Sequence, residues 1–158
     1  MGFALSPMRL LSNTFDAGGQ IPRHCTGEGG DMSPHLKWID VPAGVKSFAL
    51  ICHDPDAPLA SACSYGFVHW VLYNIPAAVS EFGEGTASGT EGKNDFGKQC
   101  YGGPMPPPGH GVHHYFFVLL ALDRVLDLEP GLTLWQLMGK VESHVIGMNR
   151  LVGTYQRL

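Results

Sequence analysis

Two polar aromatic side chains lie two positions apart at the end of a loop rich in glycine and proline. His113 and Tyr115 follow the segment YGGPMPPPGHGV, residues 101–112. Residues two apart on a strand point to the same face, so an imidazole and a phenol hydroxyl would be presented together, with His114 pointing away. Glycines let backbone amides approach an anion, and prolines order a loop before binding. The pattern indicates an anion-binding loop; the alternative is a structural loop with surface histidines.

A carboxylate is predicted to lie at the end of a strand. The sequence DPDAP, residues 54–58, directly follows the apolar run 47–53. Proline lacks a backbone N–H and fixes φ, so it ends a strand abruptly and would hold Asp54 at the sheet end. The alternative is that Asp54 or Asp56 accepts loop amides in an Asx-type turn. The two carboxylates are too close in sequence for a glycosidase pair, which needs a wider separation.

A third polar side chain lies at the head of another apolar run. His69 and Trp70 begin the run 68–75, and strand alternation predicts that they point to opposite faces. Taken alone, His69 fits a structural residue of the core or surface as well as a ligand-binding residue.

The elements that must position these residues are mostly strands. Continuous apolar runs at 47–53, 68–75 and 115–122 predict buried strands, and 8–12 and 37–40 predict shorter ones. No amphipathic helix separates the strands, which favours an antiparallel or mixed sheet in a mainly β (α+β) fold. Residues 77–112 are rich in glycine and proline and are expected to form a long loop with short edge pieces.

One helix is predicted near the C-terminus. Thr133 and Gln136 have the spacing of a capping box, and Leu132 and Leu137 fit a hydrophobic staple. Apolar residues then recur with helical period from Leu134 to Met148, which predicts a helix packed on the core. Residues 151–155 would form a last strand or a turn.

Length and composition exclude several classes of protein. The 158 residues, 44% of them hydrophobic, suit one domain, predicted over residues 8–157, with residues 1–7 as an N-terminal extension. A net charge of −4 without a basic cluster argues against a nucleic-acid partner. No apolar run reaches the roughly 18 residues that span a bilayer, so at most peripheral membrane contact is expected. The first residues lack the pattern of a secretory peptide, which predicts a cytoplasmic protein.

The cysteines show no metal-binding or redox spacing. Cys25, Cys52, Cys63 and Cys100 contain no CxxC pair, and a chain of this size does not need disulfides for stability. We predict reduced thiols, with a distant pair such as Cys25 and Cys100 as the alternative.

Several motifs in the same order resemble one known family. DPDAP, HWVLYNIP and GGPMPPPGHGVHHY leading into FVLLALD resemble the phosphatidylethanolamine-binding proteins, which include the Raf kinase inhibitor proteins. IPRHCTGEGGDMSPHLKW, VPAGVKSFALI, NDFG and GTYQR are similar to bacterial and archaeal members, so the resemblance covers Met8 to Arg157. It implies a central antiparallel or mixed sheet, a second small sheet and a C-terminal helix.

The resemblance also implies a small anion-binding pocket at one end of the sheet. The matching residues, with Pro58 at the rim, are Asp54, Pro58, His69, Pro106, Pro107, His113 and Tyr115. The chain departs from the family pattern at His114, where arginine is usual, and at Met105, where bacterial members have cysteine. Cys25 stands where a tyrosine is common.

We predict that His69, His113 and Tyr115 donate hydrogen bonds to a phosphate or carboxylate, with glycine amides as further donors. Asp54 would accept from a histidine N–H, fixing its tautomer and raising its pKa, so binding would strengthen as the pH falls. The alternative is a metal site formed by Asp54, His69 and His113; we expect no metal and no cofactor. No catalytic motif such as GxSxG or HExxH is present, so an enzyme is not expected.

Two classes of function stay open. The first is a binding protein for a small anionic or phosphorylated ligand, such as a lipid headgroup. The second is an inhibitor of a protease or kinase that uses the surface around the pocket. A protein partner and a homodimer are compatible with both.

Overall fold

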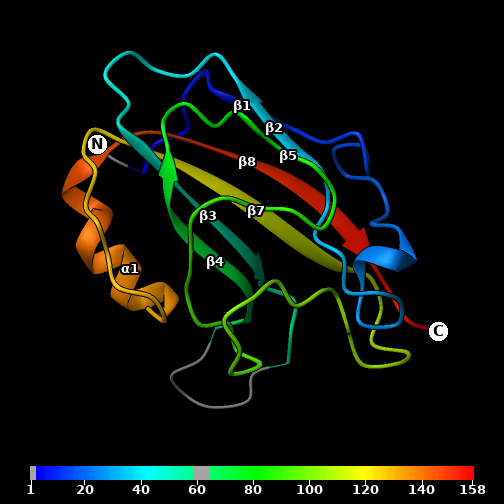
Figure 1. Ribbon diagram of the computed structural model, residues 1–158. Coiled ribbons are helices and arrows are strands. Elements are labelled where there is room, and N and C mark those ends of the chain that lie inside the picture. The colour runs from blue at the N-terminus through cyan, green and yellow to red at the C-terminus, as the bar shows by residue number, and fades with distance from the viewer. Residues whose placement is uncertain (1–2, 59–64) are drawn as a thin grey trace.

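Two antiparallel sheets form the framework of the computed structural model, which describes residues 3–58 and 65–158 (Figure 1). The larger sheet has the order β6–β4–β3–β7–β8, and the smaller has the order β1–β2–β5. The bounds of these strands are β1 Arg9–Leu11, β2 Leu36–Ile39, β3 Ser47–Asp54, β4 Phe67–Pro76, β5 Glu81–Phe82, β6 Thr90–Glu91, β7 His113–Leu122 and β8 Val145–Tyr155. The helices are η1 Arg23–Cys25, α1 Leu134–Val141 and η2 Glu142–His144.

The central strands are apolar throughout because both faces of the larger sheet are covered. Along β3, Phe48, Leu50 and Cys52 face the core between the two sheets. Ala49 and Ile51 face the second core, which is formed with α1 on the opposite side. The smaller sheet covers one face and α1 the other, as Figure 1 shows. The predicted buried strands at 47–53, 68–75 and 115–122 are therefore confirmed, as are the shorter strands near 8–12 and 37–40.

The helix begins as predicted but ends earlier. Thr133 accepts from the Gln136 amide, and the Gln136 side chain accepts from the Thr133 amide, so the capping box is formed. The helix ends at Val141, and after η2 the chain enters β8. The prediction of helix up to Met148 was therefore wrong. Val145 and Met148 do pack against the α1 side of the sheet, but they do so from a strand.

Three of the four cysteines lie in the part of the chain that the structure describes. Cys25 and Cys52 are buried, Cys100 is exposed, and all three are free thiols. The alternative of a Cys25–Cys100 disulfide is therefore contradicted. Cys63 lies outside the described residues. Within those residues, no helix combines the length and the apolar character that crossing a membrane requires.

Candidate functional site

A cavity of about 200 Å³ opens where β3 ends and where β4 and β7 begin. Because β3 runs antiparallel to both neighbours, its last residues pair with their first ones: Asp54 is opposite Phe67, and His53 is opposite Phe116. The sheet therefore brings the predicted site residues together from distant parts of the sequence. The cavity is lined by Asp54, Ala57, Pro58, Phe67, His69, Phe96, Met105, Pro106, Pro107, His113 and Tyr115. All the predicted site residues are in this set, and their role in binding a ligand stays a prediction.

His69 reaches the cavity through an irregularity in its strand. Its neighbour Trp70 pairs with Cys52, whereas Val68 pairs with His53, so His69 is the extra residue of a β-bulge. Trp70 packs in the core between the sheets, and the His69 ring lies 5.2 Å from the ring of Tyr115, a member of that core. The prediction that His69 and Trp70 point to opposite faces was wrong, because a bulge breaks the alternation and redirects a side chain.

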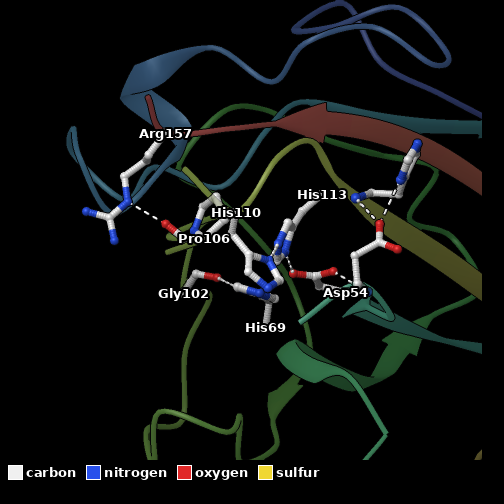
Figure 2. A network of polar contacts seen from close by, with 9 residues as sticks. Asp54, His69, Gly102, Pro106, His110, His113 and Arg157 are labelled. Carbon is white, nitrogen blue, oxygen red and sulfur yellow. Dashed lines mark hydrogen bonds and ion pairs between the residues drawn. The ribbon is translucent and has the colours of Figure 1, made fainter. Parts of the chain in front are cut away.

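Asp54 positions His113 and the turn that follows β3. Its Oδ2 accepts from Nδ1 of His113 at 2.7 Å (Figure 2). Its Oδ1 accepts from the backbone amide of Asp56 at 2.8 Å. Both side chains are almost fully buried, with 2% of Asp54 and 1% of His113 exposed. The two expectations for Asp54, an Asx-type turn and a histidine partner, are thus both met. Asp56 in turn accepts from His114. The His114 side chain is exposed, whereas His113 and Tyr115 are buried, which agrees with the prediction that His114 points away from them.

The second nitrogen of His113 is also occupied. Its Nε2 lies 2.7 Å from Nδ1 of His110, which gives a chain of hydrogen bonds from Asp54 through His113 to His110 (Figure 2). Sequence analysis missed His110, although its position three residues before His113 was visible. With both ring nitrogens bonded, His113 has none free for a metal ion, which argues against the Asp54–His69–His113 metal site.

Burial and one hydrogen bond determine the protonation state of His69. Its Nδ1 donates to the carbonyl of Gly102 at 2.7 Å, which fixes the proton on Nδ1. Burial lowers the pKa of His69, although the Gly102 carbonyl and the charge of Asp54 act in the opposite direction. Burial outweighs both of these contributions to the pKa of His69. At neutral pH the ring is uncharged, and its Nε2, which has no partner among the described residues, carries a lone pair.

Tyr115 has the one buried cavity hydroxyl without a partner among the described residues. Its side chain is 0% exposed, and its Oη makes no hydrogen bond. Burial, followed by the charge of Asp54, raises the pKa of Tyr115, so the phenol stays protonated. Because an unsatisfied buried hydroxyl costs free energy, such a group in a cavity wall is a donor ready for a ligand.

The loop 101–112 is ordered by contacts with other parts of the chain. Gly102 donates its backbone amide to His69, and Gly103 donates its amide to the Asp31 carboxylate. The Arg157 guanidinium donates to the carbonyl of Pro106 at 2.5 Å (Figure 2). The amides of Gly102 and Gly103 hold the loop and are not available to an anion. A role for the other glycine amides of the loop as donors stays a prediction.

Apolar rings form the rest of the cavity wall. Phe67 and Phe96 pack edge to face with their centroids 4.7 Å apart, and Phe67 lies 4.9 Å from the His69 ring. Met105, Pro106 and Pro107 also belong to the lining. A compact polar end and an apolar wall suit a ligand that has both kinds of surface.

A family model for phosphatidylethanolamine-binding proteins matches residues 11–156. The chain belongs to this family. A protein of Aquifex aeolicus is 42% identical over 95% of this chain and 89% of its own length. One from Methanothermobacter thermautotrophicus is 43% identical over 95% and 99%. Both carry the name UPF0098 protein, which states no activity.

Solved structures of the family share the fold. A phosphatidylethanolamine-binding protein homologue from Chlamydia trachomatis has a TM-score of 0.89 and 37% identity, over 96% of this chain and 98% of its own. YbcL of Escherichia coli, described as a member of the mammalian family, has a TM-score of 0.87 and 32% identity, over 97% and 100%. The predicted mainly β fold, with two sheets and a C-terminal helix, is confirmed.

Proposed function

We propose that this family member is a binding protein whose cavity takes a small anionic group, of the phosphate or phosphorylated-headgroup type. The observation that carries the proposal is the buried Tyr115 hydroxyl, a donor without a partner among the described residues in the cavity wall. An anion is the acceptor that gains most from such a donor, because hydrogen bonds to charged groups in a dry site are the stronger ones.

The proton on His69 determines which form of the anion binds. Neutral His69 offers an acceptor lone pair at Nε2, since its Nδ1 hydrogen is bound to Gly102. A hydrogen bond between an anion and Nε2 of His69 can form in two ways. Either the anion donates a proton of its own, as a phosphate monoanion does, or His69 takes up a proton on binding and donates it. In both cases the complex holds one proton more than the separated dianion and protein, so binding strengthens as the pH falls.

Asp54 does not oppose the anion as a bare charge would. Its two oxygens accept hydrogen bonds from His113 and from the Asp56 amide, and these donors partly compensate the negative charge of the carboxylate. The Asp54 carboxylate is therefore a positioning residue that fixes the His113 ring, while Tyr115 and His69 provide the contacts to the ligand.

The lining supports binding without a covalent step. The residues that line the cavity, within the described part of the chain, include no serine, threonine or cysteine. The Tyr115 phenol, whose pKa is raised by burial, is a poor nucleophile at neutral pH. The apolar rings Phe67 and Phe96 suit an organic group attached to the anion, so a phosphomonoester should bind more tightly than inorganic phosphate.

Calorimetric titration tests this function. Inorganic phosphate and phosphoethanolamine are titrated into the wild-type protein and into Tyr115→Phe, with Tyr65→Phe as the matched control because Tyr65 is exposed and outside this cavity. Loss of one hydrogen bond to a charged group should weaken binding about ten- to hundredfold in Tyr115→Phe and leave Tyr65→Phe unchanged.

The two titrations also separate the sources of the anionic group. Tighter binding of phosphoethanolamine supports a headgroup ligand, and equal affinities support free phosphate. Absence of binding for both compounds, or equal binding by wild type and Tyr115→Phe, contradicts the proposal. If absent binding is accompanied by dose-dependent inhibition of a purified protease or kinase, the inhibitor alternative is favoured.

A further inference from the structure

A second cluster of reactive side chains lies outside the cavity lining. His24 and Cys25 are neighbours in the short helix η1, and Glu84 follows β5. One ligand atom from each residue, a ring nitrogen, a thiol sulfur and a carboxylate oxygen, lies within 4.8 Å of the other two. Among the described residues this is the one group of this kind.

We propose that His24, Cys25 and Glu84 bind a divalent transition metal of the zinc class. Thiolate, imidazole and carboxylate are the three ligand types that zinc accepts, and together they favour zinc over magnesium or calcium, which prefer oxygen alone. A thiolate and a carboxylate carry two negative charges, which balance those of the ion. Three protein ligands leave the fourth tetrahedral position to water or an external ligand.

The distances are close to those of a bound ion. Nε2 of His24 lies 3.0 Å from Oε2 of Glu84. Metal–ligand bonds of about 2.0–2.3 Å in a tetrahedron place ligand atoms about 3.3–3.8 Å apart. The His24–Glu84 pair must therefore open slightly and the thiol must approach. The side chains of His24 and Glu84 are partly exposed, so both can adjust and an ion can enter from solvent.

Contacts around the cluster hold its members in place. The Thr14 hydroxyl donates to Oε1 of Glu84 at 2.8 Å and leaves Oε2 facing His24. The backbone of Cys25 is fixed at both ends, because its amide donates to Pro22 and its carbonyl accepts from the buried Tyr101 hydroxyl at 2.6 Å. Hydrogen bonds of this kind orient metal ligands and contribute to metal affinity.

Metal binding requires the thiol to lose its proton. The ion replaces this proton, which leaves for solvent as the sulfur–metal bond forms, with no change in oxidation state. Metal binding is therefore predicted to release a proton and to strengthen with rising pH, opposite to the direction predicted for the anion cavity.

Titration of the full-length, tag-free protein with Co²⁺ tests the proposal. A bound thiolate gives a charge-transfer absorption in the near ultraviolet, which a histidine–carboxylate pair cannot produce. We expect this absorption in the wild type, its loss in Cys25→Ala, and its displacement by Zn²⁺. Glu84→Gln should weaken Co²⁺ binding at least tenfold, and Thr14→Val should weaken it by a smaller factor.

Matched controls distinguish this cluster from adventitious binding. His144 and Asp123 form another solvent-exposed pair, 3.1 Å apart and outside the cluster, so His144→Ala should leave the absorption unchanged. The same result is expected for Cys63→Ser and Cys100→Ser.

The proposal is overturned if the wild type shows no thiolate absorption, or if the absorption survives Cys25→Ala or disappears in one of the three controls. Should Cys25→Ala fail to fold, unchanged Co²⁺ affinity in Glu84→Gln, whose side chain is partly exposed, is sufficient to reject it.

Discussion

The Tyr115 hydroxyl is predicted to contribute to binding but not to folding. Because its Oη is buried without a hydrogen bond in the ligand-free protein, Tyr115→Phe removes no bond and one desolvated polar group. The free energy of unfolding in urea should stay the same or rise by up to about 1 kcal/mol. A loss larger than about 1 kcal/mol would mean that the hydroxyl has a protein partner, and the main support for the anion site would disappear.

His69 is predicted to give the site its pH dependence. Its pKa lies below the ordinary value of 6.5 because the ring is buried, and a bound anion raises that pKa. Affinity for sulfate, whose charge is constant over this range, should therefore increase as the pH falls from about 8 to about 5, by up to about tenfold per pH unit.

Calorimetry across this pH range, with wild type and His69→Gln compared, checks this expectation. The variant keeps a side-chain amide that can donate to the Gly102 carbonyl but has no group that titrates. Its affinity should depend less steeply on pH. An identical slope in both proteins would show that the linked proton is not on His69 and would contradict this prediction.

For single residues, the sequence predicted which side chains line the cavity better than it predicted their protonation and their hydrogen-bond partners. His113 and Tyr115 lie on the same face of their strand because residues alternate along it. This property depends only on neighbouring residues, and it was predicted correctly. The pairing of His110 with His113, and the neutral state of His69, depend on burial and on partners such as Asp54 and Gly102 that lie far away in the sequence. The spacing of His110 and His113 was visible in the sequence, but burial and the distant partners were not.

The strands were predicted correctly where a continuous apolar run was the main local signal. The apolar runs at 47–53 and 115–122 predicted strands, and in the structure these strands are covered on both faces. Residues 145–148 continue the helical period of α1, yet pairing along β7 places them in β8. Long-range pairing with a preformed sheet prevailed over a local periodicity, which is the usual reason for such an error. The bulge at His69 is equally invisible in the sequence, because it concerns the register between two strands.

Two glycines on neighbouring elements should respond in opposite ways to alanine. Gly139 is an exposed position within α1, and a Cβ there meets no atom within 4 Å. A Cβ at Gly153 in β8 would lie 2.6 Å from a side-chain carbon of Ile21 and 2.8 Å from one of Phe15. Gly139→Ala should therefore stabilise the protein by about 0.5–1 kcal/mol, because alanine favours helix.

Gly153→Ala should destabilise it by about 1–3 kcal/mol, because the added methyl group overpacks the core. Thermal or urea unfolding of the two variants measures both effects. Equal stability of the two variants would contradict the packing of residues 15–21 against β8.

At the scale of the whole molecule, one cavity depends on three distant parts of the chain. The end of β3, the start of β4 and the segment from the proline loop into β7 meet because β3 lies between two antiparallel neighbours. Strand order is a non-local property, so composition and periodicity could not predict this meeting. The resemblance to the family did predict it, because its motifs carry the whole arrangement together.

A crystal structure determined after soaking in phosphate would show directly whether the cavity holds an anion. We expect tetrahedral density in the cavity, with one oxygen within hydrogen-bond distance of Oη of Tyr115 and another near Nε2 of His69. Density for water alone at a phosphate concentration that saturates the calorimetric titration would contradict it. So would side chains that fill the space between His69 and His113.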